Sequence, residues 1–178
     1  SRLVDGVLQR WATGEGVPSS ALAELLSAAV LASETDPFDP MDLAIHGLAS
    51  GEGHAEAGAP VGSGKDPLGR SLTVATDGSI VQEYGLSPEL LAMTHVWRMA
   101  GKSAHTVATK GAPEAVIALC GLSPGQAQPW QQLADDMARR GLRVLAVARA
   151  SFDGNDWPAS PHGFDFTLLG LVGLADPL

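Results

Sequence analysis

The spacing of apolar and polar residues predicts helices in the first part of the chain. The segment SSALAELLSAAVLASE (19–34) has apolar residues at positions 22, 25, 26, 29 and 30, the face of an amphipathic helix, with Ser20 as a plausible cap. In DPFDPMDLAIHGLA (36–49), Asp39 can cap a second helix, Pro40 can take its first position and Asp42 falls in its first turn. Residues 1–18 predict no element clearly.

The second part of the chain favours strands, with helices between them. Asp77-Gly78 separates two β-rich runs within LTVATDGSIVQEY (72–84), which predicts a hairpin. The segments MTHVWRM (93–99) and SAHTVATK (103–110) flank AGK and predict a second hairpin. Further strands are expected in LRVLAVARA (142–150) and FDFTLLGLVGL (164–174).

Two helices are expected among these strands. Pro113 can occupy the first turn of a short apolar helix, with Glu114 near its positive end. SPGQAQPWQQLADDMARRG (123–141) predicts a longer helix, capped by Ser123 and ended by Gly141. The whole pattern indicates an α+β fold in which helices flank a largely antiparallel sheet.

The glycine- and alanine-rich residues 49–70 are expected to form a long mobile surface loop within a single domain, 1–178, because the halves beside it are too small for separate cores. The net charge of −9 argues against a nucleic-acid surface. No apolar run is long enough to span a bilayer. With a single cysteine, Cys120, no internal disulfide can form and a reducing compartment is expected.

The residues alone suggest no catalytic group and no metal site. There is no phosphate-binding loop motif and no Cys/His spacing typical of a metal site, and the five histidines are scattered. Lys110 raises a question, because it lies between a predicted strand and the Gly111-Ala112-Pro113 turn. Taken alone, this stretch favours a strand-to-helix corner with a solvated lysine.

Several segments in a fixed order resemble the nucleotide-binding domain of P-type ATPases, and the type II branch with the calcium and sodium/potassium pumps in particular. They are DPFDPMDLAI, YGLSPELLAM, KGAPEAVIALC, GLRVLAVA and the final GLVGLADPL. The resemblance covers nearly the whole chain. In that family the domain is inserted after a DKTGT segment that carries the phosphorylated aspartate. No DKTGT occurs here, so the chain is expected to be one domain of a larger pump.

The resemblance implies a role for each matching residue. Lys110 matches a lysine deep in the adenosine pocket, Asp42 an acid that accepts a hydrogen bond from the adenine amino group, and Arg143 an arginine near the ribose and phosphates. Gly111 and Ala112 would let the base lie close to the main chain, and Leu145 would line the pocket. The positions of a stacking aromatic residue and of a phosphate-side lysine are here Leu86 and Leu91.

The resemblance implies a cytoplasmic domain of a membrane protein that binds ATP, with Mg²⁺ on the phosphates. The domain would hold the adenosine while the γ-phosphate reaches an aspartate on a separate phosphorylation domain, and it would work with that domain and the actuator domain. The fragment should bind ATP without turnover and should not enter the membrane. The alternative is a module of the same pump that does not bind nucleotide and acts in regulation or interaction, which Leu86 and Leu91 favour.

Overall fold

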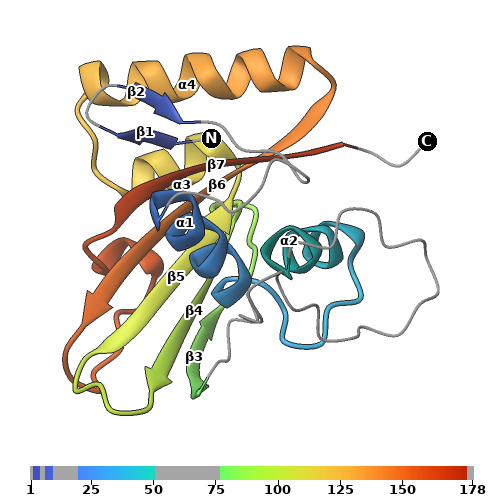
Figure 1. Ribbon diagram of the computed structural model, residues 1–178. Helices are drawn as coiled ribbons and strands as arrows, with labels where there is room; N and C mark the ends of the chain where they lie inside the picture. Colours follow the sequence, from blue (N-terminus) through green and yellow to red (C-terminus); the bar gives the residue numbers. More distant parts are fainter. Residues whose placement is uncertain (1, 5–6, 10–19, 51–76, 176–178) are drawn as a thin grey trace.

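A five-stranded antiparallel sheet forms the centre of the molecule. The computed structural model describes residues 2–4, 7–9, 20–50 and 77–175. The strands lie in the order of the sequence, each antiparallel to the next (Figure 1): β3 (Gly78–Tyr84), β4 (Ala92–Met99), β5 (His105–Gly111), β6 (Leu142–Phe152) and β7 (Thr167–Ala175). The short strands β1 (Arg2–Val4) and β2 (Val7–Gln9) form a separate antiparallel pair that the sequence pattern did not predict.

Helices cover both faces of the sheet. These are α1 (Ser20–Leu31), α2 (Pro40–Ser50), α3 (Pro113–Leu119) and α4 (Pro124–Arg139), with a short 3-10 turn, η1 (Pro161–Gly163), before β7. In β6, Ala146 and Ala148 pack in one core cluster with α3 and α4, whereas Val147 between them packs in another with α1 and α2. This alternation is expected of a strand buried on both faces. The predicted α+β fold is confirmed.

Local signals at the helix ends explain where three of the helices begin. The Asp39 carboxylate accepts a hydrogen bond from the Met41 backbone N–H at 2.8 Å, which caps α2 as predicted. Pro113 opens α3, where a missing N–H costs nothing. At the start of α4, the Gln126 side chain accepts hydrogen bonds from the backbone N–H and the hydroxyl of Ser123, at 3.1 and 2.9 Å.

The second predicted hairpin is confirmed, as β4 and β5 pair directly. For the first, β3 begins at Gly78, but the run before Asp77 lies outside the described residues. The predicted loop 49–70 also lies outside them from residue 51 onward, and its first two residues form the end of α2. The last predicted strand begins only at Thr167, because η1 and its C-cap residue Phe164 come before it; Phe164 and Phe166 still pack in the core.

The connection between β6 and β7 fixes the end of β3. The Tyr84 hydroxyl donates a hydrogen bond to the Pro158 carbonyl at 2.7 Å, and its ring meets that of Phe164 edge-on, with centroids 5.7 Å apart. These contacts hold the chain just before residues 85–91, which lead from β3 into β4. Within the described residues, no helix is both long and apolar enough to cross a membrane.

Candidate functional site

Lys110 lies near the end of β5 and points to the face covered by α1 and α2. It stands opposite Met93 of β4 and Val147 of β6 in the sheet register. Its side chain is buried, with 7% of the residue exposed. The Nζ atom donates a hydrogen bond to the Ser33 hydroxyl at 2.7 Å and forms an ion pair with Oδ1 of Asp42. The alternative of a solvated corner lysine is therefore wrong.

Asp42 comes from the first turn of α2 and meets Lys110 from the opposite side. Its Oδ1 receives the Lys110 ammonium, and its Oδ2 accepts a hydrogen bond from the Glu34 backbone N–H at 3.0 Å. Only 6% of the residue is exposed. Both carboxylate oxygens therefore have a partner, as a buried charge requires.

Ser33 is the member of this group that sequence reasoning missed. It follows α1 and is 1% exposed. Its hydroxyl donates to the Ala29 carbonyl at 2.8 Å and accepts from Lys110, so both of its hydrogen-bonding functions are used. The sequence holds no motif for such a role, because a serine near a helix end has many ordinary uses.

Burial and nearby carboxylates act in opposite directions on Lys110. Loss of water lowers the pKa of its ammonium below the usual value. The hydrogen bond and charge of Asp42, and the more distant carboxylates of Asp39 and Glu34, raise the pKa again, but burial is the larger effect. The nearby carboxylates, Asp42 above all, therefore favour the charged form of Lys110 against the effect of burial.

Gly111 and Ala112 form a tight corner against the start of β4. A Cβ atom on Gly111 would lie 2.2 Å from the Leu91 carbonyl oxygen and 2.6 Å from the Ala92 Cα, so no side chain fits there. The Ala112 backbone N–H donates to the same Leu91 carbonyl at 2.9 Å. The structure thus shows a neighbouring backbone in close approach to this glycine.

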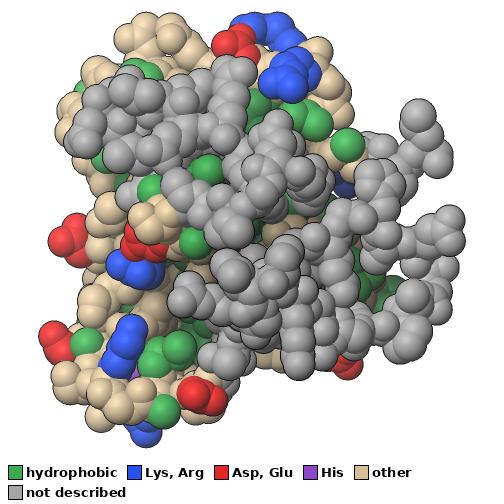
Figure 2. All heavy atoms as spheres, viewed as in Figure 1, with side chains coloured by type: hydrophobic (Ala, Val, Ile, Leu, Met, Phe, Trp, Pro, Cys, Tyr) green, Lys and Arg blue, Asp and Glu red, His purple; other side chains and the backbone are tan. Residues whose placement is uncertain are grey.

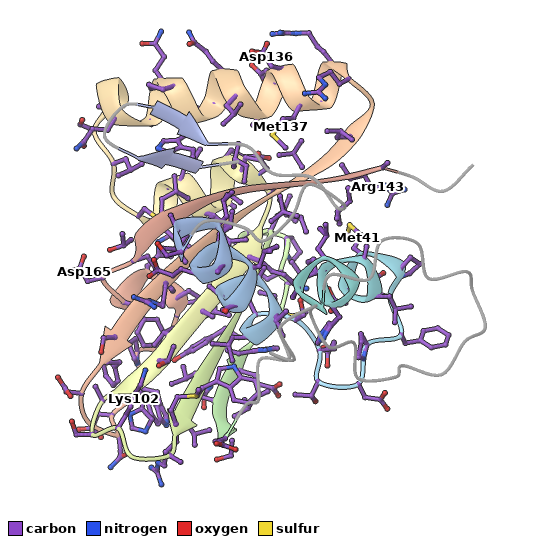
Figure 3. All side chains as sticks on the ribbon, in the orientation of Figure 1. Met41, Lys102, Asp136, Met137, Arg143 and Asp165 are labelled. Atoms are coloured by element: carbon purple, nitrogen blue, oxygen red, sulfur yellow. The ribbon has the colours of Figure 1, made fainter. Side chains whose placement is uncertain are left out.

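Arg143 and Leu145 lie on β6, on the same face as Lys110. Both lie an even number of positions from Val147 and so share its face, which packs against α1 and α2. Leu145 is half-buried in that cluster together with Met41 of α2. Arg143 is exposed, near the start of β6 (Figure 3).

The two leucines in the connection from β3 to β4 are exposed. Leu86 has 63% and Leu91 53% of its surface open to solvent. The turn between them is closed by hydrogen bonds between the backbones of Ser87 and Leu90 at 3.1 and 3.2 Å. The Leu91 carbonyl accepts the hydrogen bond from the Ala112 backbone N–H and so adjoins the site. Leu86 belongs to none of the buried clusters.

The structure therefore brings the predicted residues together in two groups. Lys110 and Asp42 are in direct contact, and Gly111 and Ala112 adjoin them along the chain. Leu145 and Arg143 follow on the same face of the next strand. In the part of the chain that the structure describes, no cluster of three or more His, Cys, Asp or Glu could hold a metal ion.

The sequence was also compared with models of known protein families. The model described as "P-type ATPase, cytoplasmic domain N" matches residues 71–178, more than half of the chain. This range holds β3 to β7 with Lys110 and Arg143, whereas α1 and α2, with Ser33 and Asp42, precede it. The chain belongs to the family of cytoplasmic N domains of P-type ATPases.

Proposed function

We propose that this domain binds ATP by its adenosine, on the face formed by α2, β5 and β6. The observation that carries the proposal is the buried contact between the Lys110 ammonium and the Asp42 carboxylate. It places a strong donor beside a strong acceptor near the end of β5, the middle strand of the sheet. Adenine shows the complementary pair, an amino donor on C6 beside a ring-nitrogen acceptor.

Each member of the pair has a distinct task in this proposal. Asp42 accepts a hydrogen bond from the adenine amino group. The Lys110 ammonium has three hydrogens, of which Ser33 and Asp42 take two, so the third can point to the base. Guanine presents an oxygen where adenine has its amino group, and that oxygen would face the Asp42 carboxylate. The site should therefore prefer adenine.

Apolar side chains beside the pair would support the base and ribose. Leu145 and Met41 lie together at the rim of the α1–α2 cluster. The aliphatic stem of Lys110 offers a further apolar surface. Position 86 holds an exposed leucine in place of an aromatic ring, so the adenine has less surface to stack on. The loss in binding free energy is about 1 kcal/mol, judged from aromatic pair energies.

Arg143 is the cation that we assign to the phosphate side. Its planar guanidinium suits phosphate oxygens. Mg²⁺, when bound, would be held by phosphate oxygens and water, in keeping with its preference for hard oxygen ligands. The γ-phosphate would then pass to an aspartate on a separate phosphorylation domain of the pump, with the actuator domain as a further partner. The contribution of this chain is to position the nucleotide.

A titration followed by amide NMR tests the proposal. The wild-type domain is titrated with ATP, adenosine and GTP, alongside Lys110→Ala and the matched control Lys102→Ala, which removes an exposed lysine from the turn between β4 and β5. We expect ATP and adenosine to shift amides of α2 and of the ends of β5 and β6. GTP should bind at least tenfold more weakly, since a hydrogen bond to a charged group contributes about 1.5–3 kcal/mol.

The variants separate a specific site from general attraction of charge. Lys110→Ala should weaken ATP and adenosine alike, and Lys102→Ala should change neither. Equal binding of GTP and ATP, or full affinity in a folded Lys110→Ala variant, would contradict the proposal. Circular dichroism and melting curves establish that the variants are folded.

A second candidate is a module that does not bind nucleotide and acts in regulation or interaction. Two observations favour it. Lys110 and Asp42 already satisfy each other in a buried pair, and both Leu86 and Leu91 present apolar surface to solvent. Absence of any amide shift with millimolar ATP or adenosine would select this candidate.

A further inference from the structure

We propose that Ser33 is a positioning residue of the nucleotide site, which orients the Lys110 ammonium from the end of α1. The inference rests on the proposed function, because it assigns Ser33 to the same site. Ser33 also lies in the part of the chain before the matched family region. It acts on the nucleotide only through Lys110.

Two partners fix the geometry at Nζ of Lys110. A lysine side chain has four flexible torsions, so its ammonium has no fixed direction of its own. Here the Ser33 hydroxyl, 2.7 Å away, and the Asp42 carboxylate hold the ammonium from two sides. With two of its hydrogens directed, the third has a defined direction.

Ser33 itself has little freedom. Its hydroxyl hydrogen is used by the Ala29 carbonyl at 2.8 Å, so the oxygen must present its lone pairs to Lys110. Its backbone N–H donates to the Val30 carbonyl at 2.9 Å, and only 1% of the residue is exposed. The neighbouring Glu34 backbone N–H holds the other oxygen of Asp42.

The sheet anchors this end of α1. The Leu31 carbonyl accepts the Trp97 indole N–H at 2.8 Å and also lies 3.1 Å from Nδ1 of His95. A carbonyl can only accept, so His95 carries its hydrogen on Nδ1. Trp97 and His95 are buried, with 3% and 2% of each residue exposed. Both side chains lie on the sheet face to which Lys110 of β5 also points. Buried polar contacts of this kind hold their partners firmly.

These contacts form one continuous path from β4 through the end of α1 to the site. A positioning role predicts that loss of the Ser33 hydroxyl changes the state of Lys110 without changing the fold. The test compares Ser33→Ala with Ser27→Ala, a matched serine change within α1. Both are titrated with adenosine and ATP by amide NMR.

We expect Ser33→Ala to bind both ligands about tenfold more weakly than the wild type, as for loss of a hydrogen bond to a charged group. A second readout is the pKa of Lys110, followed through its side-chain carbon resonances. Ser33 favours the charged form by accepting from it, so Ser33→Ala should lower this pKa further. The other charged groups around the ammonium, Asp42, Asp39 and Glu34, are unchanged in the variant. Ser27→Ala should alter neither affinity nor pKa.

A purely structural role of Ser33 would lower the melting temperature and leave affinity and the Lys110 pKa as they are, which would overturn the inference. If the wild type binds neither ligand, the proposed function and this inference fail together. If it binds and Ser33→Ala binds equally well, only the inference fails. Should Ser33→Ala not fold, Trp97→Phe is the deciding variant, because it removes one hydrogen-bond donor to the Leu31 carbonyl. About threefold weaker binding in Trp97→Phe supports the anchoring path, and wild-type affinity would refute it.

Discussion

Removing the Asp42 carboxylate should destabilise the domain strongly, because it leaves the Lys110 ammonium buried without its counter-charge. In Asp42→Ala, only the neutral Ser33 hydroxyl at 2.7 Å would remain as a partner. The Glu34 backbone N–H would lose its acceptor as well. Breaking one side of a buried ion pair costs about 3–5 kcal/mol.

The expected change in melting temperature follows from the size of the chain. For 178 residues, each kcal/mol corresponds to a shift of about 2–4 °C, so Asp42→Ala should melt roughly 6–20 °C below the wild type. The matched control is Asp136→Ala. Asp136 pairs with Arg139 on the surface, where its side chain is 65% exposed, and such pairs contribute about 1 kcal/mol or less. Charged side chains at the C-terminal end of α4 lie on the surface (Figure 2).

A double-mutant cycle shows whether the cost comes from the unpaired charge. Lys110→Met keeps much of the apolar stem and removes the ammonium. If the isolated charge is the cause, Asp42→Ala combined with Lys110→Met should be more stable than Asp42→Ala alone. Urea unfolding at fixed salt gives the free energies of unfolding for the four proteins.

The pH dependence of the same variants provides a second check. Burial lowers the pKa of Lys110 in the folded state below its unfolded value of about 10.4. Between these two pKa values the unfolded chain binds more protons, so the free energy of unfolding rises with pH. Asp42→Ala should lower the folded pKa further and begin this rise at lower pH. The gap between wild type and variant should therefore be smaller at pH 9.5 than at pH 7.

An unpaired buried charge is excluded as the cause if Asp42→Ala loses no more stability than Asp136→Ala, or if adding Lys110→Met to Asp42→Ala destabilises the domain further. A gap that widens towards alkaline pH would also contradict it.

Two further predictions concern the corner beside Lys110. Gly111→Ala should destabilise the domain by about 1–3 kcal/mol or more, because its Cβ would lie 2.2 Å from the Leu91 carbonyl and backbone cannot move aside cheaply; urea unfolding measures this, and an unchanged midpoint would refute it. Leu91→Lys should strengthen ATP over adenosine, with much of the gain lost at 0.5 M salt, whereas Leu86→Phe should strengthen both ligands alike. Titrations at two salt concentrations check both changes, and a salt-independent gain in Leu91→Lys would contradict the first.

Local chemistry in the sequence was sufficient to predict most of the elements. The caps at Asp39 and Ser123 and the prolines at the starts of α2, α3 and α4 act within a few residues of themselves. The β4–β5 hairpin needs only a short turn between two strand patterns. The family resemblance rested on short segments of the same kind, and the match to the N-domain family confirmed it.

Other features of the fold could not be predicted from neighbouring residues. Phe164 and Phe166 fit a strand pattern but lie before β7, and the ring of Phe164 packs against Phe152 of β6 and Tyr84 of β3. The small sheet of β1 and β2 carried no clear pattern in residues 1–18. Sequence periodicity reports which residues are apolar, and it does not report which distant surface covers them.

The sequence alone determined most of the elements, the antiparallel α+β class and the identity of the residues that resemble an adenosine site. Only the tertiary structure decided that Lys110 contacts Asp42, 68 positions away, and that Ser33 completes the group. Packing of α1 and α2 on one sheet face removes water from Lys110, and a buried ammonium must then find acceptors nearby. That requirement acts between segments far apart in the chain, so no local pattern can express it.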